Sequence, residues 1–330
     1  MRSCLLTGAA SCLLGLTAAA GIQPIVRVQN PGGASGGQWA RSINHTSTGV
    51  VLNPLQISRG RGEAIKPGTE LRILCAGDSI TVGTFSDTDG GDGNGYRLRL
   101  RNDLSADRVS YVGTVTTKGG NMSDGYFAAW PSKTIQYIAD NIDPSLQQRP
   151  NVILLHAGTN DMNPNHTIST EGNDPAQAVD RLGSLVDRMI ELCPDAVILV
   201  AMIINTCDPA QAPATHEFQS LIPGAVQRRY DAGHRVLAAN FTSFPTTELR
   251  DCIHPTNPGY SLFGDFWYDF FTQIPRDWIQ KPMAAPSKPK QPDSQPSSGE
   301  SPSHAVLNRS LVARHALVAS LVASLTILVC

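Results

Sequence analysis

The chain has 330 residues, with 26 lysines and arginines against 28 aspartates and glutamates, so its net charge is only −2. This balance excludes the strongly basic field of a protein whose main partner is nucleic acid. Charged residues make up 16% and hydrophobic residues 41% of the chain. That composition excludes a disordered acidic protein, a coiled coil and a polytopic membrane protein, and it is sufficient for a sizeable core.

Residues 1–20 have the pattern of a secretory signal peptide. Arg2 precedes a short apolar run from about Cys4 to Leu16, and small residues follow at Ala18-Ala19-Ala20. The alternative is an uncleaved anchor, but the run is short for a membrane span. We expect cleavage after Ala20. Residues 21–68 are rich in Gly and Asn and weakly periodic, which predicts an extension on the surface of the folded domain.

The other end of the chain, residues 304–330, has the pattern of a GPI-attachment signal. An uncharged apolar tail over 316–330 follows a polar spacer, and the small residues Ser297-Ser298-Gly299 lie before it. We expect attachment near 297–301, with Asn308 as a competing position. The alternative is a tail-anchored span, for which the apolar tail is short. Residues 279–303 are rich in Pro and Ser and are predicted to form a stalk.

The remaining cysteines and the glycosylation sequons are consistent with secretion. If both end signals are removed, Cys75, Cys193, Cys207 and Cys252 remain, and four cysteines allow three pairings. Asn-x-Ser/Thr sequons begin at Asn44, Asn121, Asn165, Asn240 and Asn308.

The central segment, residues 69–278, alternates short apolar runs with helical periodicity and is predicted to form one domain. The expected strands are 71–76, 111–113, 152–156, 196–204 and 236–239, and the expected helices are 96–104, 134–142, 176–193, 216–232 and 257–271. This alternation predicts an α/β fold, a three-layer α/β/α sandwich around a parallel sheet of about five strands. In such sheets the functional site lies at the carboxyl ends of the strands.

The segments at those ends carry the residue types of nucleophilic catalysis. Ser79 follows the first strand in a Gly-Asp-Ser sequence, and Asn160 follows a later strand in Gly-Thr-Asn-Asp. Asp251 and His254 lie in a D-x-x-H-P sequence before the last helix. A hydroxyl needs a base, and the base needs an acid to orient it. We therefore predict Ser79 as nucleophile, His254 as base and Asp251 as orienting acid, with no cofactor and no metal.

These three blocks resemble the SGNH (GDSL-type) hydrolase superfamily, whose fold is flavodoxin-like. More narrowly, residues 71–275 are similar to secreted carbohydrate esterases of family 3, which include acetyl xylan esterases. The resemblance supports the roles of Ser79, Asp251 and His254. It also implies an oxyanion hole formed by the Ser79 backbone N–H, the Asn160 amide and a donor from a second block.

That second block departs from the family pattern. The family sequence E-G-x-x-G-x-T-I corresponds to residues 128–135, where Ala129 and Ser132 replace both glycines. Ser132 still offers a backbone N–H, but a positive φ there would cost serine more than glycine. A catalytically weakened, glycan-binding wall protein is therefore one alternative function.

Residues around these blocks are assigned to the substrate or to packing. Asp78, Trp130 and Tyr126 are predicted to contact substrate, and Trp130, Tyr126 and Phe127 either stack on sugars or are packing residues. His156 is expected to be a packed histidine and Cys75 an apolar filler. The acidic loop 87–95 has incomplete calcium ligands and is interpreted as a rim of the site.

We also hypothesise a Cys207–Cys252 disulfide, because both cysteines fall at the active-site edge. The sequence therefore predicts a secreted, surface-anchored serine esterase, and the resemblance implies that it acts on short-chain acetyl esters of a polysaccharide. Its expected partners are the acylated carbohydrate and the membrane or wall that holds its anchor. The other alternative is a lipid or lysophospholipid esterase of the same superfamily.

Overall fold

The computed structural model describes residues 51–58, 64–117 and 119–285. The predicted signal segments 1–20 and 304–330 lie outside the described residues, as do most of the extension and of the stalk. In the described ranges, no helix is long and apolar enough to cross a membrane.

Parallel strands form a sheet in the order β2-β1-β4-β5-β6, which confirms the predicted α/β fold. The strands are β1 (Glu70–Gly77), β2 (Arg108–Val112), β4 (Val152–His156), β5 (Val197–Met202) and β6 (Val236–Asn240). They correspond to the five expected strands. The two-residue strand β3 (Ala128–Ala129), which pairs with the end of β1, was not predicted because it is too short for a periodic signal.

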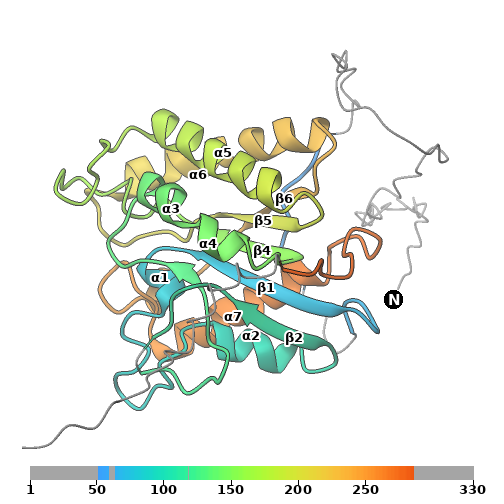
Figure 1. The fold of residues 1–330 in the computed structure, drawn as a ribbon. Coiled ribbons are helices and arrows are strands. Elements are labelled where there is room, and N and C mark those ends of the chain that lie inside the picture. Colours follow the sequence, from blue (N-terminus) through green and yellow to red (C-terminus); the bar gives the residue numbers. More distant parts are fainter. Residues whose placement is uncertain (1–50, 59–63, 118, 286–330) are drawn as a thin grey trace, which may run out of the picture. The chain divides into compact units, whose positions relative to one another are not determined.

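Helices cover both faces of the sheet (Figure 1). One face carries α3 (Ile135–Asn141), α4 (Asp143–Leu146), α5 (Pro175–Leu192) and α6 (Ala212–Asp231). The other face carries α2 (Arg97–Asp103) and α7 (Asn257–Phe271), and the short elements α1 (Ser79–Val82) and η1 (Thr246–Glu248) lie in loops. Helix α6 begins four residues before the predicted position 216, and α7 has the predicted bounds.

The alternation of side chains along β1 divides the core into two clusters. Leu71, Ile73 and Cys75 point to the cluster that contains α2 and α7, whereas Leu74 and Ala76 point to the cluster beneath α3, α5 and α6. All five side chains are fully buried. The sheet is therefore covered on both faces, as its continuous apolar strands predict.

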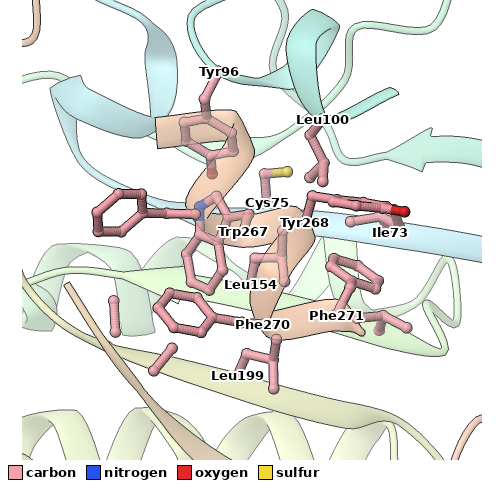
Figure 2. Packing of buried hydrophobic residues seen from close by; sticks show 14 of the residues in the cluster. Ile73, Cys75, Tyr96, Leu100, Leu154, Leu199, Trp267, Tyr268, Phe270 and Phe271 are labelled. Carbon is pink, nitrogen blue, oxygen red and sulfur yellow. The ribbon is translucent and has the colours of Figure 1, made fainter. Parts of the chain in front are cut away.

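An aromatic face of α7 fills the first cluster. Figure 2 shows Trp267, Phe270 and Phe271 from this helix against Cys75 of β1 and Leu154 of β4. Cys75 is a buried free thiol, in agreement with its prediction as an apolar filler. This packing fixes the position of α7, and with it the turn that precedes its first residue.

The described part of the N-terminal extension pairs with the free edge of β6. The Leu55 N–H donates to the Ala238 carbonyl at 2.8 Å, and the Asn240 N–H donates to the Leu55 carbonyl at 3.0 Å. Ser58 adds a hydrogen bond from its N–H to the Asp269 carboxylate. These contacts cover backbone groups that an edge strand otherwise leaves unpaired.

Candidate active site

Ser79 is positioned by a turn that only glycine allows. At Gly77, the last residue of β1, a Cβ atom would lie 2.2 Å from the His156 carbonyl oxygen. Beyond it, the Asp78 side chain caps α1 by accepting the Ile80 N–H at 3.0 Å. Ser79 is the first residue of this helix and is 6% exposed. It follows the carboxyl end of β1, an interior strand of the sheet.

Asp251 and His254 lie in one tight turn before α7. One Asp251 carboxylate oxygen accepts the backbone N–H groups of Ile253 and His254, and the other lies 2.7 Å from His254 Nδ1. On the opposite side of the ring, His254 Nε2 lies 2.8 Å from Ser79 Oγ. The structure therefore brings the three predicted catalytic side chains into one hydrogen-bonded row.

The charges in this row suit a base opposite a hydroxyl. Burial raises the pKa of Asp251, but hydrogen bonds from the His254 backbone and ring outweigh it, and the net pKa lies below the usual value. The group is therefore a carboxylate at neutral pH. The carboxylate accepts a hydrogen bond from Nδ1–H, which leaves the Nε2 lone pair of His254 facing the Ser79 hydroxyl.

A disulfide connects the catalytic turn to the segment after β5. Cys207 and Cys252 are bonded, which agrees with the hypothesis from the sequence. The Cys252 carbonyl also accepts the Thr206 hydroxyl at 2.8 Å and the Cys207 N–H at 3.3 Å. Cys252 has a positive φ of 68°, a conformation that needs support from its surroundings. These bonds hold the backbone between Asp251 and His254.

Three donors near Ser79 could serve an oxyanion. The Asn160 side-chain amide donates one hydrogen to the Lys133 carbonyl at 2.9 Å, so its second hydrogen stays available. Within the described residues, the backbone N–H groups of Ser79 and Ser132 make no hydrogen bond. The Asn160 bond also joins the third block to the second, because Lys133 follows Ser132 directly.

Ser132 has a φ of 57°, so the residue that replaces the family glycine does adopt the left-handed conformation. That conformation costs a residue with a Cβ about 1–2 kcal/mol. The neighbouring helix α3 is held by Asp161, which accepts the Ile135 N–H at 3.0 Å and binds Arg181 at 3.1 Å. The second block therefore has a left-handed backbone at position 132 despite the substitution.

Asp78 was predicted to contact substrate, but it lies inside the protein. It is fully buried, and burial raises the pKa of its carboxyl to about 6. Its carboxylate accepts a hydrogen bond from the Ile80 N–H at the start of α1. A fully buried carboxyl cannot contact a substrate directly, so the predicted substrate role is replaced by a structural one.

The three aromatic residues in and just before the second block differ in their exposure. Trp130 is partly buried and lines a surface cleft, whereas Tyr126 is 43% exposed and is not among the residues that line it. Phe127 is fully buried beneath the Arg97 guanidinium, 4.4 Å from its ring centroid. Stacking of Phe127 on a sugar is therefore wrong.

That cleft has a volume of about 370 Å³ and adjoins α1 and the second block. Its walls include Val82, Phe85, Val115, Trp130 and Pro131. Sequence analysis missed Phe85, which follows α1 in an ordinary loop composition. Its ring meets the His254 ring edge-on, with 5.3 Å between centroids. The signal that identifies Phe85 is therefore its spatial contact and not a sequence motif.

Two further predictions concern buried or acidic residues. His156 is buried, which lowers its pKa to about 3, and its Nε2 accepts the Ile204 N–H at 3.2 Å.

In the acidic loop, Asp89 pairs with Arg250 and Asp92 accepts hydrogen bonds from Asn94. Across the part of the chain that is described, no group of three or more His, Cys, Asp or Glu side chains could hold a metal.

A nucleophilic serine, a histidine base and an acid at the carboxyl end of a parallel sheet define a serine hydrolase site. Residues 75–262 match the GDSL-like lipase/acylhydrolase family, and the chain belongs to this family. It is a carboxylic ester hydrolase of the SGNH/GDSL type.

Solved structures share this fold. A family 3 carbohydrate esterase from Clostridium thermocellum is 23% identical, with a TM-score of 0.51, and the match covers 64% of this chain and 100% of that one. A family 3 carbohydrate esterase from Talaromyces cellulolyticus is 20% identical, with a TM-score of 0.50, over 62% and 97% of the two chains.

Among curated proteins, the chain is 26% identical over 146 residues to a protein of Acetivibrio thermocellus that carries the provisional name endoglucanase X. The match covers 43% of this chain, and the chain spans 59% of that relative's length.

Removing the disulfide should lower turnover more than substrate binding. In a Cys207→Ala/Cys252→Ala variant, the turn between Asp251 and His254 loses its covalent support, and we expect kcat to fall about tenfold or more with little change in KM. Unfolding should become easier by about 2–4 kcal/mol, as is typical for loss of a native disulfide. The control is Cys193→Ala, which removes a buried free thiol; a double variant with full kcat would contradict the prediction.

Loss of the Asn160 amide should remove an oxyanion donor. We expect Asn160→Ala and the near-isosteric Asn160→Asp to lower kcat about 100- to 1000-fold. Ser132→Gly keeps the backbone N–H, so its kcat should stay within about threefold of wild type. Steady-state kinetics on a soluble acetate ester checks both, with thermal unfolding as the control for folding. Full activity in both Asn160 variants, or a large loss in Ser132→Gly, would show that other groups stabilise the oxyanion.

Proposed function

We propose that the protein is a secreted, surface-anchored serine esterase that removes short acyl groups, acetyl above all, from a polysaccharide. The observation that carries the esterase mechanism is the row of hydrogen bonds from Asp251 through His254 to Ser79, at 2.7 and 2.8 Å. The candidate oxyanion donors are the backbone N–H groups of Ser79 and Ser132 and the side-chain amide of Asn160. Together they supply a nucleophile, a base and an electrostatic site.

The reaction proceeds in two steps through an acyl-enzyme. Ser79 Oγ attacks the ester carbonyl while His254 Nε2 takes its proton, and the three donors stabilise the resulting oxyanion. The intermediate expels the alcohol, which receives the proton from His254. Water then loses a proton to His254 and attacks the acyl-serine, which releases the carboxylic acid and restores the Ser79 hydroxyl.

Two observations support a carbohydrate substrate. The solved structures that share the fold include carbohydrate esterases of family 3. The cleft is linked to the triad through Phe85, whose ring contacts His254. It combines the aromatic walls Phe85 and Trp130 with the polar side chains of Thr84, Thr117 and Asp87. Aromatic faces with hydroxyl and carboxylate groups around them suit a sugar ring, which has apolar faces and polar edges.

The apolar part of the same cleft favours one alternative, an esterase for longer acyl chains. Val82 and Val115 line it together with Trp130, and an alkyl chain would fit against them. The other alternative, a weakened glycan-binding protein, is disfavoured because the Ser79 hydroxyl is already bonded to its base. A series of acyl chain lengths separates these functions.

The proposed location follows from the two end segments, which lie outside the described residues. Residues 1–20 would direct secretion, and residues 304–330 would be exchanged for a GPI anchor near 297–301. The Pro- and Ser-rich segment 279–303 would then separate the esterase domain from the membrane or wall. This arrangement suits an enzyme whose substrate is an insoluble polymer outside the cell.

Hydrolysis of p-nitrophenyl acetate, butyrate and octanoate by the full chain tests the acyl preference. We expect acetate to be turned over most efficiently, and Ser79→Ala to lose about 10⁴-fold or more in kcat because no nucleophile remains. A preference for octanoate would instead support the lipid esterase. Equal rates for wild type and Ser79→Ala would support the binding protein.

Anchorage is tested by expressing the full chain in a eukaryotic secretory host. We expect surface-bound protein that phosphatidylinositol-specific phospholipase C releases into the medium, because a lipid anchor is the only proposed attachment. A variant with Ser297→Leu, Ser298→Leu, Gly299→Leu, Ser301→Leu and Asn308→Leu removes the small residues and should abolish this release. Surface protein that resists the phospholipase but is extracted by detergent would indicate a tail-anchored span.

A further inference from the structure

We propose that Phe85 is the residue that recognises the leaving alcohol, by stacking the exposed part of its ring on a pyranose ring in the cleft that Phe85 lines. This inference rests on the proposed carbohydrate esterase function and assigns a specificity residue to it. Phe85 follows α1, lines the cleft, and contacts the ring of the histidine that must protonate the alcohol.

Phe85 combines two features that are unfavourable for a bulky apolar residue. Its φ is 68°, in the left-handed region where a bulky side chain is an outlier. Its side chain is also 40% exposed, although it is a large apolar group. Glycine at this position would remove both costs. Strained residues with exposed aromatic rings beside a reactive group indicate a functional role.

The position of the ring identifies the part of the substrate that it meets. In the first step, His254 gives its proton to the oxygen of the departing alcohol, so the alcohol must lie next to the imidazole. Phe85 meets that imidazole edge-on, with an interplanar angle of 88° and 5.3 Å between the ring centroids. A group that rests on Phe85 is therefore adjacent to the leaving oxygen, on the alcohol side of the scissile bond.

The surrounding loop holds the ring in this orientation. The Phe85 carbonyl accepts the Thr88 N–H at 3.2 Å and the Thr88 hydroxyl at 2.7 Å. The Arg250 guanidinium lies over the Phe85 ring, 5.7 Å from its centroid, and pairs with Asp89. The Arg250 N–H donates to the His254 carbonyl at 2.8 Å. Phe85 and the catalytic turn are thus braced against each other before substrate arrives.

The polar lining of the cleft complements the edge of a sugar. The Asp87 carboxylate is exposed in the cleft and accepts no hydrogen bond from the described residues. It can therefore accept hydrogen bonds from the hydroxyl groups of a ligand. Trp130 forms another part of the wall. A ring with one apolar face and several hydroxyls matches this lining better than a simple alkyl alcohol does.

The test compares two acetate substrates: xylose tetraacetate, whose acetyl groups are carried by a pyranose ring, and ethyl acetate, whose alcohol has no ring. For the full chain, Phe85→Ala should lower kcat/KM on xylose tetraacetate about 3- to 10-fold through KM, the range expected for loss of one stacking contact. On ethyl acetate, which has no ring to stack, kcat/KM should change by less than about twofold. Phe85→Trp keeps an aromatic ring, so it should retain the preference for xylose tetraacetate that Phe85→Ala loses. The control, Met283→Ala, removes another exposed apolar side chain.

Each outcome decides the inference. Equal losses on both esters in Phe85→Ala would show that the ring only positions His254, and an unchanged sugar preference would show that it does not touch the alcohol. Phe85→Gly relieves the backbone strain but lacks the ring, so recovery of sugar preference in that variant would also overturn the proposal. If wild type itself does not favour xylose tetraacetate over ethyl acetate, the carbohydrate function fails instead, independently of Phe85.

Discussion

The proposed reaction depends on one hydrogen bond, between His254 Nε2 and Ser79 Oγ, which joins groups 175 positions apart in the sequence. Neither residue can perform the reaction alone, because the hydroxyl is a weak nucleophile and the imidazole needs a defined orientation. The fold brings them together from opposite ends of the domain. Ser79 comes from the first strand of the sheet and His254 from the turn before the last helix.

Each partner is held by a different physical device. Ser79 is held by the close approach of Gly77 to β4 and by the cap that starts α1. His254 is held by the Asp251 carboxylate, by the disulfide through Cys252, and by the aromatic packing that seats α7 on the sheet. The buried core thus fixes two loops at its edge to within hydrogen-bonding distance, which is what an oriented triad requires.

Much of this could be predicted from the sequence because the signals are local. Continuous apolar runs identify β1, β4, β5 and β6, and Asn257-Pro258 marks the start of α7 within one turn. The three polar blocks follow these elements directly, so parallel strands bring them to the same edge. The same logic placed Cys207 and Cys252 near each other.

The parts that sequence analysis missed depend on three-dimensional burial. Asp78 lies beside the nucleophile in sequence, yet it is fully buried and acts as a cap. Phe127 and Trp130 are three residues apart, but Phe127 is fully buried and Trp130 is partly exposed at the cleft. Phe85 has no motif at all, and its importance appears only through its backbone conformation and its contact with His254. Composition cannot distinguish such neighbours, because it does not report which side chain faces water.

The second block shows how a changed sequence can keep a required shape. Ser132 replaces a family glycine and nevertheless has a φ of 57°, and the bond from Asn160 to the Lys133 carbonyl holds the backbone beside it. The cost of the strained serine is small compared with the effect of losing an oxyanion donor, which is about 3–4 kcal/mol of the barrier. The altered block is therefore compatible with an active esterase.

Covalent labelling of the nucleophile tests the central claim most directly. The full chain is treated with a fluorophosphonate, and the modified residue is identified by peptide mass spectrometry in wild type and in His254→Ala. If Ser79 is activated by His254, the label appears on Ser79 in wild type and forms at least about 100-fold more slowly in the variant. Labelling of another serine, or of Ser79 at the same rate without His254, would contradict the account.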